Sequence, residues 1–147
     1  MKKILKPLIS VVAIGALSLS ININQNVFAD TCEYDTSSKV NPDYSTMNCL
    51  LTETALRYNV PPEIVKAVAE GESGNWRHFD TNGKAIVTAD NGIGVMQITN
   101  QARYDQDQLK SDLVYNIQAG VETLDKMFTR KDLPSSNDGE RDMWEHW

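Results

Sequence analysis

Glu72 stands where an amphipathic helix should present an apolar side chain. Four residues before it recur at the spacing of one helical face, namely Pro61, Ile64, Val65 and Val68. An apolar surround disfavours the charged form of a carboxyl group, and so does the negative end of a helix dipole. Both effects would keep a proton on Glu72, as a general acid requires. The alternative is a side chain at a frayed helix end that points into water.

The helix that carries this residue is predicted to begin at Pro62 and to end at Ser73. Proline suits the first turn of a helix, and Gly74 suits the left-handed conformation that is common just after the last helical residue. Glu70 falls on the opposite side, one turn from Lys66. An ion pair with Lys66, four residues away on the solvent-exposed surface, is sufficient to explain an acid at position 70.

Residues 1–29 have the pattern of a secretory signal peptide. Three lysines precede an apolar run from Leu8 to about Ile21, and Val27-Phe28-Ala29 resembles a cleavage site. The run is shorter than the roughly 20 residues of a membrane span. We therefore expect a secreted or wall-associated protein with no stable membrane anchor after cleavage, and an uncleaved anchor is the alternative.

Charge limits the partners that the mature chain can have. Removing residues 1–29 takes away three lysines and no acid, so the net charge falls from −6 to −9 over the remaining 118 residues. A chain this acidic should not bind nucleic acid or anionic lipid non-specifically. Neither a metal nor another cofactor is expected, because isolated histidines (His78 and His146) and two cysteines do not form a zinc site. A monomer is expected.

Cys32 and Cys49 are the only cysteines. Outside the cell such a pair can persist as a disulfide, which would tie a polar arm (residues 30–41) to the first helix. The alternative is a buried Cys49 and a free Cys32.

The pattern predicts a mainly α protein with a short loop or β excursion after the helix that ends at Ser73. Residues 42–147 are expected to form one domain. Besides the helix that ends at Ser73, we expect helices at about 42–58, 112–130 and 140–147, a short strand at 85–88 and a loop at 133–139. The first helix would bury Leu51, Ala55 and Tyr58, and the third Ile117, Val121, Leu124 and Phe128.

Three blocks in order resemble the soluble lytic transglycosylase family, lysozyme-like enzymes that cut peptidoglycan glycan strands. They are Val60-Pro61-Pro62-Glu63 leading to Glu72-Ser73-Gly74, then Gly92-Ile93-Gly94-Val95-Met96-Gln97-Ile98-Thr99, and then Asn116-Ile117-Gln118-Ala119-Gly120-Val121. The first resembles the family's catalytic Glu-Ser pair, the second its Gly-Leu-Met-Gln segment and the third its Asn-Ile…Gly helix. The resemblance covers about residues 56–124.

This resemblance implies that Glu72 protonates the glycosidic oxygen between N-acetylmuramic acid and N-acetylglucosamine. The same carboxylate then removes a proton from the muramic C6 hydroxyl, and a 1,6-anhydro product forms. A lysozyme-like hydrolase, the closest alternative, needs a second carboxylate. Asp80 and Asp90 are its nearest candidates in sequence.

Further site residues follow from the resemblance, and Ser73 and Met96 have structural alternatives. Ser73 would lie near the catalytic carboxyl, or else bond to its own helix end. Gly94 would let the backbone approach a sugar, and Gln97 would bond an N-acetyl group. Met96 would form a groove wall, or else belong to the core. Asn116 and Gly120 are expected to be structural, and Trp76 and Phe79 to be packed rather than stacked on sugar.

The sequence departs from the family pattern at its end. The family continues into a helix with an Ala-Tyr-Asn-type motif, whereas this chain ends at Asp142-Met143-Trp144-Glu145-His146-Trp147. A truncated domain with weakened activity or stability is expected on that basis. An inactive glycan-binding remnant is the alternative from a different functional class.

Overall fold

The computed structural model describes residues 31–99, 101–132 and 147, and this part of the chain is mainly α-helical, as predicted. Its helices are α2 (Tyr44–Arg57), α3 (Pro62–Ser73), α4 (Gln106–Ser111) and α5 (Leu113–Phe128). Over the described residues only isolated β-bridges occur, Phe79–Ala85, Val87–Ile93 and Ile93–Ile98, so the strand expected at 85–88 is reduced to single bridges. No helix in this part is both long and apolar enough to cross a membrane.

Helix α2 begins where the sequence provides a cap. The Asp43 carboxylate accepts a hydrogen bond of 2.7 Å from the backbone N–H of Thr46, which satisfies one free donor of the first turn. Leu51 and Ala55 are fully buried, as predicted, whereas Tyr58 is only half-buried and follows the helix end.

The arm before α2 is tied down. Cys32 and Cys49 form a disulfide, which closes a loop that should stabilise the fold by about 3 kcal/mol. The Asn41 side chain accepts hydrogen bonds from the N–H groups of His78 and Phe79 and donates to the Phe79 carbonyl. The polar arm is therefore fixed at two places, because the disulfide joins it to α2 and Asn41 joins it to the loop after α3.

Helix α5 begins one residue after Asp112, whose carboxylate accepts from the Tyr115 N–H at 3.0 Å. It buries Ile117 and Val121, while Leu124 and Phe128 are half-buried. The short helix α4 was not predicted. Its signals are a capping aspartate, Asp105, and a single buried side chain, Leu109, which is too little for a periodic pattern.

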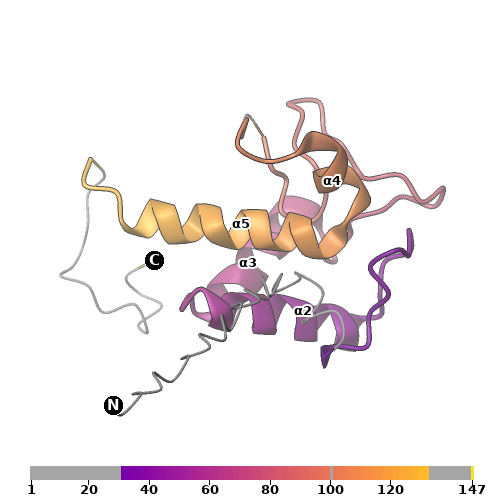
Figure 1. Ribbon diagram of the computed structural model, residues 1–147, viewed down its shortest axis with the longest axis horizontal. Coiled ribbons are helices and arrows are strands. Elements are labelled where there is room, and N and C mark those ends of the chain that lie inside the picture. The colour runs from indigo at the N-terminus through magenta and orange to yellow at the C-terminus, as the bar shows by residue number, and fades with distance from the viewer. Residues whose placement is uncertain (1–30, 100, 133–146) are drawn as a thin grey trace, which may run out of the picture.

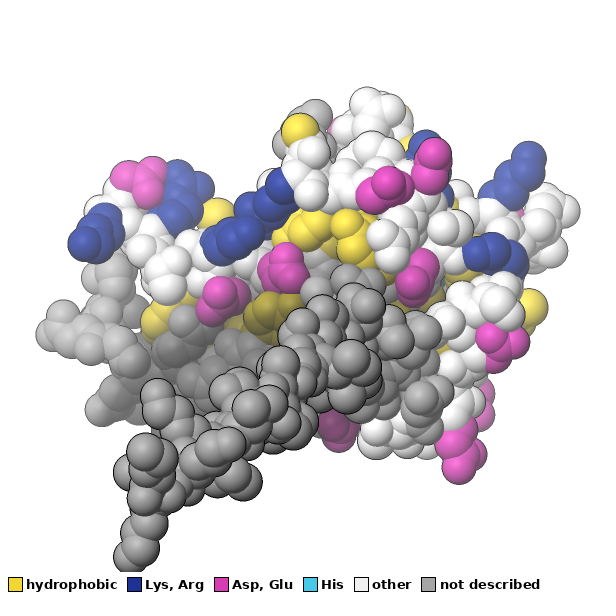
Figure 2. All heavy atoms as spheres, in the orientation of Figure 1, with side chains coloured by type: hydrophobic (Ala, Val, Ile, Leu, Met, Phe, Trp, Pro, Cys, Tyr) yellow, Lys and Arg dark blue, Asp and Glu magenta, His cyan; other side chains and the backbone are white. Residues whose placement is uncertain are grey.

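Figure 1 shows α5 and α2 running along the length of the molecule, with α3 behind them and α4 beside the loops of residues 75–105. Helix α2 packs on both α3 and α5, and α4 packs on α5. The space-filling view shows acidic side chains spread over this face instead of gathered in one patch (Figure 2). The helix predicted at 140–147, His146 and the loop at 133–139 lie outside the described residues, apart from Trp147.

Candidate active site

A cavity of about 220 Å³, here called the Glu72 cavity, lies where the three motif-bearing segments meet. Helix α3 contributes Val68 and Glu72. The remaining walls come from the segment 96–101 and from α5. They comprise Met96, Gln97, Ile98, Thr99, Gln101, Gly120, Thr123 and Leu124. The lining of the cavity therefore brings together residues up to 56 positions apart in sequence. Glu72 is the one ionisable side chain among the described lining residues.

Glu72 lies at the edge of the buried face of α3. The buried row of this helix is Val65 and Ala69, and the neighbouring row, Ile64 and Val68, is half-buried and leads to Glu72. Glu72 itself is exposed, so the expectation that it is buried is wrong. The periodicity found the correct side of the helix, but the core ends one turn before the helix does.

Glu70, a second acid near the end of this helix, does not form the expected pair with Lys66. The Glu70 carboxylate accepts a hydrogen bond of 3.1 Å from the Asn75 N–H and so helps to close the helix. Within the described ranges the single ion pair is Arg130–Asp132, at the far end of α5.

The end of α3 is built from left-handed backbone. Gly74 has φ +56°, and Asn75 and Trp76 follow with φ of +58° and +52°. The Ser73 hydroxyl donates to the Ala69 carbonyl at 2.8 Å, which is the structural alternative considered for it, and Ser73 does not line the cavity.

The aromatic residues after α3 are packed. Trp76 is buried, stacks on Tyr44 at 4.6 Å between ring centroids and donates from Nε1 to the Lys66 carbonyl at 3.1 Å. Phe79 is also buried, as expected. Neither side chain lines the Glu72 cavity.

Gly94 permits a close approach inside the protein. It has φ +69°, and a Cβ at this position would lie 2.2 Å from His78 Nδ1 and 2.8 Å from Asn116 Nδ2. Gly94 is buried and does not line the cavity. The contact that it allows is thus to these two side chains, and not to a sugar as the sequence suggested.

Gln97 lines the cavity, but its amide is already engaged. Its Nε2 donates to the Gly94 carbonyl at 2.7 Å, and its Oε1 shares the Thr88 hydroxyl, 2.6 Å away, with the Asp90 carboxylate. A Cβ at Gly92 would lie 2.3 Å from this oxygen, so a larger residue there would displace the Gln97 amide. The structure therefore holds Gln97 in one orientation at the cavity wall.

Asn116 fixes the turn that carries Met96 and Gln97. It is fully buried, accepts from the Met96 N–H at 3.0 Å and donates to the carbonyls of Ile93 and Leu109 at 2.9 and 3.2 Å. Met96 in turn packs on Gly120, where a Cβ would lie 2.6 Å from the Met96 side chain. The structural roles expected for Asn116 and Gly120 are confirmed.

The two candidate second carboxylates are engaged in turns. Hydrogen bonds from the N–H groups of Lys84 and Asn82 lower the pKa of Asp80, and one from the Thr88 hydroxyl lowers the pKa of Asp90. Neither residue lines the Glu72 cavity.

Sequence reasoning missed Glu122, the carboxylate that accepts the most hydrogen bonds from side chains among the described residues. It accepts hydrogen bonds from the hydroxyls of Tyr58 and Tyr104 at 2.7 and 2.9 Å and from the Gln118 amide at 2.9 Å. Burial raises the pKa of Glu122, but these donors outweigh it and lower the pKa overall. Only the spacing of four between Gln118 and Glu122 marks this cluster in the sequence, because the tyrosines come from other segments.

His78 has the structural role expected for it. It is fully buried, its Nδ1 accepts from the Val95 N–H at 3.3 Å, and its Nε2 lies 3.3 Å from the Lys110 carbonyl. These contacts fit a neutral ring that donates through Nε2. Burial lowers the pKa of His78 to about 4 from its ordinary value of 6.5.

We expect this histidine to make the fold sensitive to mild acid. The unfolded chain takes up the proton near pH 6.5 and the folded chain only near pH 4, so stability is full above pH 6.5 and falls as the pH is lowered. Between pH 7.5 and 4.5 the loss should be about 2–3 kcal/mol. Urea unfolding across this range measures it, with NMR of the His78 ring protons. A ring that titrates near pH 6.5 in the folded protein would contradict the prediction.

Comparison with protein-family models, with curated proteins and with solved structures finds no match to this chain.

Proposed function

We propose that this protein is a secreted lytic transglycosylase, which cleaves the N-acetylmuramic acid–N-acetylglucosamine bond of peptidoglycan with Glu72 as acid and then base. One observation carries the proposal. The end of α3, the Met96–Gln97 turn and the Gly120 face of α5 meet at one cavity, and these are the three blocks that resemble the family.

The chemistry needs one carboxyl group in two roles. Glu72 gives its proton to the glycosidic oxygen as the bond to the muramic anomeric carbon breaks. The resulting carboxylate takes the proton of the muramic C6 hydroxyl, whose oxygen closes on the anomeric carbon. The proton count on Glu72 is restored, no water is consumed, and the product carries a 1,6-anhydro ring.

The cavity suits this cycle better than it suits hydrolysis. A glycosidase of the usual kind needs a second carboxylate about 5–5.5 Å away if retaining, or about 6.5–9.5 Å away if inverting. Glu72 is the single carboxyl group among the described lining residues, and Asp80 and Asp90 are bound in their own turns. This supports the one-carboxylate mechanism.

Substrate binding would supply the dry surround that the free protein lacks. Glu72 is exposed, but Val68, Met96, Ile98 and Leu124 give the cavity apolar walls. A sugar lying against these walls would exclude water, and an apolar surround favours the neutral, proton-bearing form of a carboxyl group. The proposed substrate is thus also part of what prepares the acid.

The products of digestion test the proposal. We expect mass spectrometry of peptidoglycan incubated with the purified protein to show fragments with 1,6-anhydro-muramic ends. Reducing muramic ends would instead indicate a hydrolase, and would require a second carboxylate. Binding to insoluble peptidoglycan without release of fragments would indicate an inactive glycan-binding protein.

A further inference from the structure

A second and larger cavity adjoins the candidate active site. It has a volume of about 790 Å³ and is here called the amide cavity, lined by Val87, Asn91, Ile93, Gln101, Ala102, Tyr104, Gln106 and Lys110. Gln101 also lines the Glu72 cavity, so the two spaces share a wall. A branched polymer with one unit in the Glu72 cavity could therefore place a branch in the amide cavity.

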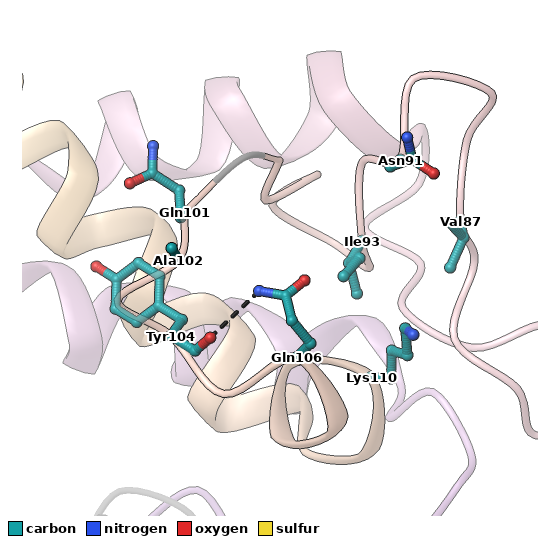
Figure 3. A pocket seen from close by; sticks show the side chains of 8 residues that line it. All are labelled: Val87, Asn91, Ile93, Gln101, Ala102, Tyr104, Gln106 and Lys110. Atoms are coloured by element: carbon teal, nitrogen blue, oxygen red, sulfur yellow. Dashed lines mark hydrogen bonds between the residues drawn. The ribbon is translucent and has the colours of Figure 1, made fainter.

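Amide groups around this cavity retain unused hydrogen-bonding capacity. Gln106 donates through Nε2 to the Tyr104 carbonyl at 3.2 Å, and Figure 3 shows its other end turned into the space between Ile93 and Tyr104. The side chains of Asn91 and Gln101 make no hydrogen bond within the part of the chain that the structure describes. Carboxamides both donate and accept, as peptide groups do, so these side chains can pair with a peptide backbone.

Lys110 adds a positive charge to the same space. It is exposed at the end of α4, and no carboxylate of the described residues lies within 4 Å of its Nζ. The chain as a whole carries a net charge of −6. Lys39 Nζ donates to the carbonyl of the neighbouring residue, Ser111, so two ammonium groups belong to this end of α4. On an acidic protein, a positive region of this kind attracts an anionic group.

The aromatic residue of the cavity is not arranged to stack on a sugar. Tyr104 is buried, and its hydroxyl donates to Glu122 at 2.9 Å and lies 3.1 Å from the Ala119 carbonyl. The Arg103 guanidinium lies 4.7 Å from its ring centroid, and Tyr115 packs edge-on at 6.2 Å. With its surroundings filled in this way, Tyr104 serves as a wall, and recognition falls to the amides and Lys110.

We propose that the amide cavity binds the stem peptide of peptidoglycan, a short peptide branch with free carboxylates, while the sugar that bears it occupies the Glu72 cavity. This inference rests on the proposed function for its substrate. It makes the protein selective for peptide-bearing glycan over bare glycan, with Lys110 pairing with a stem carboxylate.

Charge reversal at Lys110 tests the selectivity. For Lys110→Glu we expect kcat/KM on peptide-bearing glycan to fall about tenfold, because an attraction becomes a repulsion. Cleavage of glycan stripped of its peptides by an amidase should be unchanged. Lys131→Glu is the matched control, since it makes the same charge change beyond the far end of α5 and should affect neither substrate. Circular dichroism checks that both variants fold, and Gln106→Ala replaces Lys110→Glu if the latter does not.

Two results would overturn the inference: an equal loss on both substrates, which would indicate a sugar in the amide cavity, or no loss on either. If the wild-type protein cleaves neither glycan, the proposed function fails. A binding experiment then tests the peptide site independently of activity. In an NMR titration with the free stem tetrapeptide, chemical-shift changes at the backbone amides of Asn91, Gln106 and Lys110 would support the peptide site. Unchanged spectra would exclude it.

Discussion

Replacement of Glu72 by glutamine should lower the rate of glycan cleavage by about 10³-fold, because an amide can neither give nor take the proton that both steps need. No other carboxyl group of the described residues lines the cavity to replace it. The measurement is the initial rate of release of soluble fragments from peptidoglycan, with product ends identified by mass spectrometry.

The same variant should fold as well as the wild-type protein. Glu72 is exposed, no hydrogen bond to its side chain is present among the described residues, and surface substitutions of this kind usually change stability by less than about 0.5 kcal/mol. Loss of a negative charge at the C-terminal end of α3 should if anything be slightly favourable. Activity and stability are therefore expected to separate at this residue.

Glu70→Gln is the matched control for this experiment. It makes the same substitution two residues away, on the exposed side of the helix, and the glutamine oxygen can still accept from the Asn75 N–H. We expect full activity from it. Comparable activity in the two variants would remove Glu72 from the mechanism and with it the proposed transglycosylase.

Asn116→Ala should be the most destabilising single substitution that we can identify, at about 4 kcal/mol. It leaves the Met96 N–H and the carbonyls of Ile93 and Leu109 without their partner in a fully buried place, and each such loss costs about 1–3 kcal/mol. The three costs do not add fully, because water can enter the space that the side chain vacates. Urea unfolding at pH 7.5 measures the change.

Activity should also suffer in this variant under conditions where it remains folded. The bond from Asn116 to the Met96 N–H holds the turn that places Met96 and Gln97 at the cavity wall. Asn48→Ala in α2 is the control, since Asn48 is half-buried but its side chain has no hydrogen bond in the described part of the chain. A loss below 1 kcal/mol for Asn116→Ala, or an equal loss for Asn48→Ala, would contradict the structural role argued for Asn116.

The sequence alone determined the local structure around the candidate site. Apolar periodicity, with Pro62 and Gly74 as end signals for α3, identified α2, α3 and α5 to within about two residues. The capping roles of Asp43 and Asp112 were seen only in the structure. The same periodicity placed Glu72 on the correct side of its helix. Two cysteines outside a metal pattern were enough to suggest the disulfide that is observed.

Tertiary structure decided what each of these local features contacts. Glu72 proved exposed because the core ends at Ala69, and Gly94 faces His78 and Asn116 instead of the cavity. Almost no feature of the sequence predicted the Glu122 cluster or the amide cavity. Their members come from segments far apart in the chain, and neither spacing nor composition encodes which side chains the packing of α2, α4 and α5 brings together. Helix periodicity and end signals act through neighbouring residues, so the sequence reveals them. A site is formed by residues far apart in the chain, so it depends on how the helices and loops pack.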